Sequence, residues 1–268
     1  MNRLIKKTMT EAAAAKIVCI TGASSGIGRA TAVWFAKHKY HIVTGARRHE
    51  LLTAHAEELE KLGAASVLTL PLDVRSREAV NDFCAALVNR HPGGPDILVN
   101  NAGLALGRDT VAEGKDDDWI GMMETNVLGV LWMTRAILKT MLVRKSGHIV
   151  MVGSIASHQV YEGGAVYCAS KFGARAIAET MRMELLGTGI RLTTVDPGMV
   201  ETEFSLVRFQ QDSQRAKAVY AGMEPLKGED VAECIGFAVT RPPHVNLESI
   251  MVNPTDQANV KQVYRRST

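Results

Sequence analysis

The sequence predicts a single α/β domain in which a doubly wound, seven-stranded parallel sheet carries helices on both faces. Short apolar runs alternate with longer segments of helical periodicity along most of the chain. No stretch rich in proline, glycine or serine divides the sequence, and no internal repeat interrupts it. Strict alternation of strand and helix builds right-handed βαβ units, which gives a parallel sheet covered on both sides. A chain of 268 residues, 46% of them hydrophobic, is long enough to bury one large core.

Strands are predicted from short runs of β-branched and aliphatic residues, and helices from apolar residues spaced three or four apart. We expect strands at residues 16–21, 40–45, 66–70, 96–100, 148–152, 190–195 and 249–252. We expect helices at residues 27–39, 49–62, 76–90, 119–143, 166–187 and 228–240. The chain then divides into a flexible leader at 1–15, the folded domain at 16–253, and a basic tail at 254–268 that is disordered or reaches a neighbouring copy. Within the domain, a polar insertion at 201–222 should lie over the carboxyl ends of the strands, where ligands bind in such sheets.

Composition argues against several classes of partner. The formal net charge is only +3 and the basic residues form no run, so we expect no nucleic-acid surface. The four cysteines lack CxxC spacing and a nearby histidine pattern, which argues against disulfides and a metal site and favours the cytoplasm. No window approaches the roughly 20 apolar residues that span a bilayer, so no membrane segment is expected.

A glycine-rich turn directly follows the first predicted strand and opens the first predicted helix. Gly22 allows the tight turn, Gly26 lets the backbone approach a pyrophosphate, and Gly28 permits close packing of helix on strand. The amides of the helix N-terminus bind phosphate. The alternative, an ordinary glycine-rich turn, is disfavoured by the position after a strand. The predicted Rossmann-like dinucleotide site includes Gly22, Ser24, Ser25, Gly26, Ile27 and Gly28.

The end of the second predicted strand favours NADP(H) as the cofactor. Ala46, Arg47 and Arg48 stand where an NAD-specific site usually carries an acidic residue. A guanidinium fork holds a 2′-phosphate well, although both arginines could instead be solvated residues at the start of a helix. Asp73 and Val74 follow the third strand and should lie near the adenine, while Asp73 could equally be a helix cap.

Ser154, Tyr167 and Lys171 are the candidate catalytic residues. Tyr167 and Lys171 are four apart and so share one face of a predicted helix, although such a pair alone is more often an ordinary surface pair. A tyrosine, with a reference pKa of about 10, is a poor base at neutral pH, so the phenolate must be stabilised by Lys171 and a nicotinamide's positive charge. Tyr167 would then act as general acid or base, with Ser154 hydrogen-bonding the substrate oxygen.

These motifs, with Asn100-Asn101-Ala102-Gly103, Asn126 and Pro197-Gly198 in the same order, resemble the short-chain dehydrogenase/reductase family over residues 16–253. The resemblance implies that Asn126 bends a helix to hold a proton-relay water beside Lys171, where the sequence alone would allow a helix cap or a surface amide. It implies that Lys171 anchors the nicotinamide ribose. It also implies dimers or tetramers formed through the helices at 119–143 and 166–187. By the same resemblance, the cofactor is also contacted by Tyr167, Asn100, Ala102, Gly103, Pro197, Gly198, Val200 and Thr202.

Residues 101–107, 198–209 and 240–246 look more specifically like bacterial NADP-dependent 3-hydroxy acid dehydrogenases and sulfoacetaldehyde reductases. That resemblance implies a short anionic substrate. Arg208 is the candidate that pairs with its head group, because a guanidinium binds a carboxylate or sulfonate bidentately, and Tyr161 could add a hydroxyl. Arg208 could otherwise be a solvated helix residue and Tyr161 a packing aromatic. The stretch 157–162 departs from the subgroup, so His158 or Gln159 could touch the substrate.

The substrate-binding set is therefore Ser154, Tyr161, Tyr167 and Arg208. Two other functions compete with an anion-specific enzyme. A broad carbonyl reductase would accept larger apolar ketones, which the aromatic content of 5% and Arg208 disfavour. A non-catalytic NADP-binding regulator would typically lack the catalytic tyrosine or lysine, and this chain has both.

Overall fold

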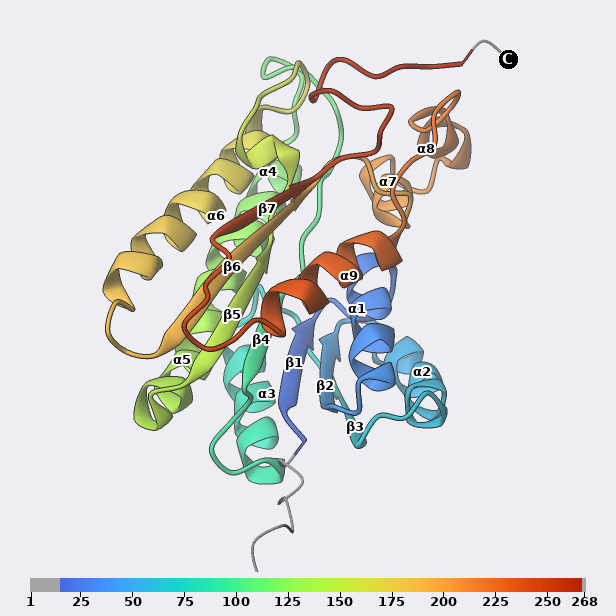
Figure 1. Ribbon diagram of the computed structural model, residues 1–268. Helices are drawn as coiled ribbons and strands as arrows, with labels where there is room; N and C mark the ends of the chain where they lie inside the picture. The colour runs from blue at the N-terminus through green and yellow to red at the C-terminus, as the bar shows by residue number, and fades with distance from the viewer. Residues whose placement is uncertain (1–14, 267–268) are drawn as a thin grey trace, which may run out of the picture.

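The computed structural model describes residues 15–266 and forms one sheet in the order β3-β2-β1-β4-β5-β6-β7 (Figure 1). The strands are β1 (Ile17–Thr21), β2 (His41–Ala46), β3 (Ser66–Pro71), β4 (Ile97–Asn100), β5 (Gly147–Val152), β6 (Ile190–Pro197) and β7 (Ser249–Val252). Every pairing is parallel, and the chain reverses direction across the sheet between β1 and β4. The predicted fold class is confirmed, and the reversal creates the crevice where such sheets bind ligands.

Helices cover both faces of the sheet. The helical segments are α1 (Gly26–Lys37), α2 (His49–Lys61), α3 (Arg77–Arg90), α4 (Asp116–Met123), η1 (Glu124–Gly129), α5 (Val130–Arg144), η2 (Ile155–Ser157), α6 (Ala165–Glu184), α7 (Phe204–Arg208), α8 (Ser213–Ala218) and α9 (Gly228–Val239). Side chains alternate along each strand. Ile20 therefore packs in the core with α1, α2 and α9, while the adjacent Cys19 packs with α3, α5 and α6.

The predicted helix at 119–143 begins earlier and contains an irregular turn. The structure has α4, the π-helical turn η1 and α5 in one continuous run, with Asn126 inside the turn. By length and composition alone this run, Asp116–Arg144, could cross a membrane, so the expectation that no segment is apolar enough is wrong. Met133, Ile137 and Met141 are buried against the sheet, which is how a core helix packs.

The insertion and the tail lie side by side at the carboxyl end of the sheet. The insertion 201–222 contains α7 and α8. Arg265 donates to the carbonyl of Val219 (2.9 Å), and the Arg266 amide donates to the carbonyl of Gly222 (2.6 Å). Residues 254–266 are therefore docked on the insertion of their own chain rather than free of it. Nearly all of the predicted leader 1–15 lies outside the described residues.

Candidate active site

The glycine turn after β1 forms a cradle of main-chain groups. Gly22 and Gly26 have φ of 66° and 54°, a region that favours glycine. A Cβ on Gly22 would lie 2.8 Å from the Ala102 Cα, and one on Gly28 would overlap the amide of Asn101. Ser25 caps α1 without a side-chain hydrogen bond, which leaves the first amides of that helix available. The cradle therefore fits a pyrophosphate at a helix N-terminus.

The two arginines after β2 lie beside this cradle. The Arg48 guanidinium donates to the hydroxyls of Ser24 (3.2 Å) and Ser25 (2.9 Å) and pairs with the Glu203 carboxylate at 2.8 Å. Arg48 is therefore held at the glycine turn and is more than a solvated helix start. Arg47 is exposed, and its charge helps to lower the pKa of Asp73, after the larger effects of Arg75.

Asp73 does not cap a helix. Its carboxylate accepts from the Arg75 amide and guanidinium at 2.7–3.1 Å, and Ser76 caps α3 instead by accepting from the amide of Ala79. Val74 is buried and packs against the Gly129 backbone. The proposed place of Asp73 and Val74 beside an adenine stays a prediction.

The segment after β4 is built mainly on side-chain to main-chain bonds. The side-chain Nδ2 of Asn100 donates to the Thr134 hydroxyl (2.8 Å), so this side chain points to α5. The Ala102 amide donates to the Thr21 hydroxyl (3.0 Å). Gly103 is exposed and lies near the Lys171 ammonium, 3.5 Å from where a Cβ would stand. Only the exposed main chain of this segment is left to face a cofactor.

Asn126 fixes that same segment from the π-helical turn. Its side chain accepts from the Leu104 amide (2.9 Å) and donates to the Leu104 carbonyl (2.8 Å) and the Ser170 hydroxyl (3.0 Å). At 2% exposure it is neither a helix cap nor a surface amide. The irregular turn thus aligns Leu104 with α6, which carries Tyr167 and Lys171.

Ser154, Tyr167 and Lys171 meet at the carboxyl end of β5. All three are buried, and the Lys171 ammonium donates to the Val152 carbonyl at 3.1 Å. Burial raises the pKa of Tyr167 well above its ordinary value, while hydrogen bonding with Ser154 and the charge of Arg208 act in the opposite direction. Burial lowers the pKa of Lys171 to about 8, and the Asp196 carboxylate opposes that change. Burial therefore favours the protonated phenol, which is the form that can donate a proton.

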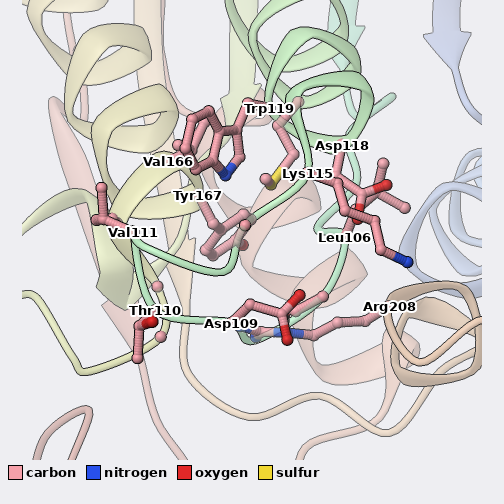
Figure 2. A pocket seen from close by; sticks show the side chains of 16 residues that line it. Leu106, Asp109, Thr110, Val111, Lys115, Asp118, Trp119, Val166, Tyr167 and Arg208 are labelled. Carbon is pink, nitrogen blue, oxygen red and sulfur yellow. Dashed lines mark hydrogen bonds between the residues drawn. The ribbon is translucent and has the colours of Figure 1, made fainter.

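A cavity beside Tyr167 holds the predicted head-group arginine (Figure 2). Arg208 reaches it from α7, with its Nε donating to the Gly107 carbonyl at 3.0 Å. Its guanidinium lies 5.8 Å from the centre of the Tyr167 ring and 5.4 Å from that of Tyr161. Arg208 is thus directed to the Tyr167 ring and is not a solvated helix residue. Asp109 and Asp118 line the same cavity.

Tyr161 lies behind this cavity rather than along its wall. Arg108 and Arg208 flank its ring at 5.8 and 5.4 Å. Its hydroxyl is buried, and burial raises its pKa while the Arg208 guanidinium acts in the opposite direction. The packing role is therefore evident, and a hydroxyl contact with substrate stays a prediction.

The loop after β6 approaches the cradle from the other side. Thr202 packs on Gly26, where a Cβ would lie 3.1 Å from the Thr202 Cβ. Val200 is buried and pairs with Leu226. A Cβ on Gly198 would overlap the Gln257 side chain, which accepts from the Met199 amide at 2.8 Å. The tail therefore supports the Pro197-Gly198 turn, a contact that sequence reasoning missed.

His158 and Gln159 are engaged away from the cavity. His158 Nε2 lies 3.1 Å from the Asp196 carboxylate, and Gln159 accepts from the Val260 amide at 3.1 Å. Asp196, at the end of β6, was missed as a site residue, although an acidic residue in the apolar run before Pro197-Gly198 could have indicated it. Across residues 15–266, no group of three histidine, cysteine, aspartate or glutamate side chains could hold a metal ion.

Comparisons with known proteins identify relatives across nearly the whole chain. Residues 16–213 match the family model of the short chain dehydrogenases. An NADP-dependent 3-hydroxy acid dehydrogenase of Schizosaccharomyces pombe is 44% identical over 94% of this chain and 97% of its own length. A sulfoacetaldehyde reductase of Chromohalobacter salexigens is 43% identical over 90% of this chain and 94% of its own.

The fold also matches a solved structure. The closed form of a serine dehydrogenase complexed with NADP⁺ superposes with a TM-score of 0.87 at 37% identity, covering 94% of this chain and all of the other. Because the family model and these relatives span most of the sequence, this chain belongs to the short-chain dehydrogenase family.

Proposed function

We propose that this protein is an NADP(H)-dependent oxidoreductase that interconverts a short anionic hydroxy compound and its aldehyde or ketone. One observation carries the choice of substrate class: the Arg208 guanidinium and the Tyr167 phenol line one cavity, with the cation 5.8 Å from the ring centre. A substrate held by its anionic end at Arg208 would present a carbon a few bonds away to the phenol. Relatives named for 3-hydroxy acids and sulfoacetaldehyde support this class.

The cofactor assignment rests on the cradle and its arginines. The main chain around Gly22 and Gly26 would receive the pyrophosphate at the start of α1. Arg48 and Arg47 would hold the 2′-phosphate, and Arg48 already bonds two hydroxyls of the cradle. Lys171, beside Gly103, would hold the nicotinamide ribose. When bound, the nicotinamide supplies or accepts the hydride.

The proton step belongs to the protein. During reduction Tyr167 donates its proton to the carbonyl oxygen, and during oxidation the phenolate takes the proton back from the alcohol. Ser154 donates a hydrogen bond to the same oxygen and stabilises the charge that develops on it. Lys171 is buried one helical turn from Tyr167 on α6. Its protonated ammonium stabilises the phenolate.

The substrate cavity carries charges of both signs. Arg208 suits a carboxylate or a sulfonate, while Asp109 and Asp118 on the same cavity could accept from an ammonium group. A hydroxy amino acid such as serine would use both, whereas 3-hydroxypropionate or isethionate would use only the cation. The head group is therefore the property to measure first.

The test compares substrates of matched size. NADPH oxidation is followed with sulfoacetaldehyde, malonic semialdehyde and a neutral aldehyde, and NADP⁺ reduction with serine and 3-hydroxypropionate. We expect kcat/KM for at least one anion to exceed that of the neutral aldehyde by about 100-fold, since an ion pair with two hydrogen bonds contributes about 3 kcal/mol. Equal rates with the neutral aldehyde would contradict the proposed role of Arg208.

A broad carbonyl reductase is the second candidate. The cavity walls include apolar side chains, among them Leu106, Trp119 and Val166, which could pack against an uncharged ketone. Faster turnover of apolar ketones than of every anion in the panel would favour this function.

The outer faces of α5, η1 and α6 support self-association as a homodimer or homotetramer. Leu128, Leu131 and Phe172 are exposed there by 40%, 37% and 39%. Contiguous apolar side chains on adjacent helices are typical of an interface between copies.

The four cysteines are unpaired, as in a reducing compartment such as the cytoplasm.

A further inference from the structure

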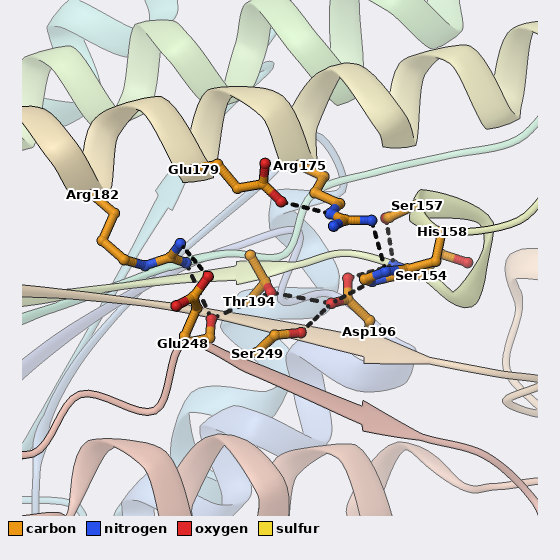
Figure 3. A network of polar contacts seen from close by, with 10 residues as sticks. All are labelled: Ser154, Ser157, His158, Arg175, Glu179, Arg182, Thr194, Asp196, Glu248 and Ser249. Carbon is orange, nitrogen blue, oxygen red and sulfur yellow. Dashed lines mark hydrogen bonds and ion pairs between the residues drawn. The ribbon is translucent and has the colours of Figure 1, made fainter.

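A buried carboxylate stands at the point where β5, β6 and β7 approach the catalytic residues (Figure 3). Asp196 ends β6, just before the Pro197-Gly198 turn, and is only 2% exposed. Its Oδ2 accepts from the hydroxyls of Thr194 (3.1 Å) and Ser249 (3.0 Å) and lies 3.1 Å from His158 Nε2. A buried carboxylate needs such donors, because burying an unpaired charge costs several kcal/mol.

The second oxygen of Asp196 is directed to the catalytic serine. Oδ1 accepts from the Ser154 amide at 3.2 Å, and the same amide also donates to the Ser157 hydroxyl. Gly153 must lack a side chain, because a Cβ there would overlap this oxygen. The carboxylate thus takes the space beside the chain where β5 turns into Ser154.

Asp196 also shares a small cavity with Lys171. That cavity is lined by Lys171, Asp196 and Arg175, among other residues. Asp196 is the carboxylate among the residues that line this cavity, and its negative charge acts to raise the pKa of Lys171. Within residues 15–266, the Lys171 ammonium donates one hydrogen bond, to the neutral carbonyl of Val152.

We propose that Asp196 is a positioning residue of the reaction, whose buried carboxylate holds the main chain of Ser154 in place and balances the positive charge of Lys171. The first effect fixes where the serine hydroxyl meets the substrate oxygen. The second keeps the lysine cationic behind Tyr167. The inference rests on the proposed dehydrogenase reaction, and it holds for any head group the substrate carries.

The charges around Lys171 agree with this assignment. Burial lowers the pKa of Lys171 to about 8, and Asp196 opposes that change. Tyr167 and Arg175 flank Lys171 on α6, and His158 follows η2. Of these groups, only Asp196 and Tyr167 can carry a negative charge. Burial raises the pKa of Tyr167 and so disfavours its phenolate, which leaves the Asp196 carboxylate as the anion. Removing the carboxylate should therefore let Lys171 lose its proton at a lower pH.

An outer layer holds Asp196 from the solvent side. His158 Nδ1 lies 2.9 Å from an Arg175 guanidinium nitrogen, and Arg175 pairs with Glu179 at 2.7 Å one turn further along α6. His158 is thus held between Arg175 and Asp196. This layer explains why His158 points to β6 and away from the substrate cavity.

The test replaces the carboxylate by an amide of nearly the same shape. Asp196→Asn is compared with the wild type and with Asp96→Asn, a matched change at the opposite end of the sheet, where Asp96 accepts from the Ile17 amide at 2.8 Å. Turnover is measured against pH with any aldehyde that the wild type reduces, and NADPH binding is measured by fluorescence. Hydrogen exchange is measured for the peptide that contains Ser154, which needs no turnover.

We expect Asp196→Asn to lower kcat at least about fivefold, since small displacements of reacting groups have large effects on rate. Its NADPH Kd should stay within about threefold of the wild type, as expected when an interaction other than cofactor binding is lost. The alkaline fall of kcat should move about half a pH unit or more toward acid, and the Ser154 peptide should exchange faster. Asp96→Asn should change only the melting temperature.

A pH profile and Ser154 exchange that match the wild type in Asp196→Asn would overturn the inference. So would the same changes in Asp96→Asn, since they would report general destabilisation. If Asp196→Asn does not fold, Ser249→Ala removes one donor to Oδ2, and unchanged kcat and exchange in that variant would overturn the inference as well. If no aldehyde of the panel reacts with the wild type, the proposed substrate class fails, and Ser154 exchange still decides the role of Asp196.

Discussion

Arg208→Ala is the change that tests the substrate class most directly. In the proposed complex the guanidinium forms two charge-assisted hydrogen bonds with the head group, each contributing about 1.5 kcal/mol at the lower end of the usual range. The sum of about 3 kcal/mol corresponds to about 100-fold in kcat/KM. The Gly107 amide still donates to the residue 208 carbonyl (3.0 Å) after the change, so the insertion stays attached through its main chain.

The measurement is kcat/KM of the variant with an anionic aldehyde and with a neutral aldehyde of equal size. We expect the 100-fold loss for the anion only, and less than about fivefold for the neutral aldehyde. Arg215→Ala is the matched control, because Arg215 lies in the same insertion and stacks on Phe209 at 4.6 Å without lining the cavity. Equal losses for both aldehydes would refute Arg208 as the head-group ligand and assign it to holding the insertion.

Four further substitutions test other parts of the site and the fold. Tyr167→Phe should lower kcat at least about 1,000-fold while the NADPH Kd from fluorescence titration changes little, because only the proton donor is lost; retained turnover would contradict the mechanism. Arg48→Ala, and to a smaller extent Arg47→Ala, should raise the Kd of NADPH about tenfold or more and that of NADH much less, and equal losses would exclude the 2′-phosphate contact. His148→Gln should make the protein less sensitive to acid. Burial lowers the pKa of His148 to about 3, so the unfolded chain binds a proton below pH 6.5 that the folded chain does not. That difference destabilises the wild type by about 2 kcal/mol at pH 5, and denaturant unfolding at pH 7 and pH 5 should show a smaller decrease in the variant.

Local sequence patterns were sufficient to predict the strands and most of the helices. Strand boundaries agree to within two residues, because most of these strands are rich in aliphatic and β-branched residues and are bounded by polar residues, glycine or proline. The irregular turn around Asn126 could not be derived from periodicity, since it depends on hydrogen bonds to Leu104, 22 residues away along the chain. Its presence was expected only from the family resemblance.

The residues that support the site were harder to predict than those that perform the chemistry. Tyr167 and Lys171 were predicted from their spacing only together with the other motifs that carry the family resemblance, whereas Asp196 and Gln257 make contacts that only the folded sheet creates. Asp196 meets Ser154 across 42 positions, and Gln257 meets Met199 across 58. A polar residue inside an apolar strand is the one signal in the sequence that points to such a contact.

The position of Arg208 also bears on the direction of the proton step. In the free chain its charge, 5.8 Å from the Tyr167 ring centre, acts to lower the pKa of that phenol, against the larger effect of burial. An anionic substrate that pairs with Arg208 would offset this charge, so the phenol would keep its proton more firmly than before. A neutral aldehyde would leave the charge in place. Binding of the anion would therefore select the protonated form of Tyr167, which is the form that reduction of an aldehyde requires.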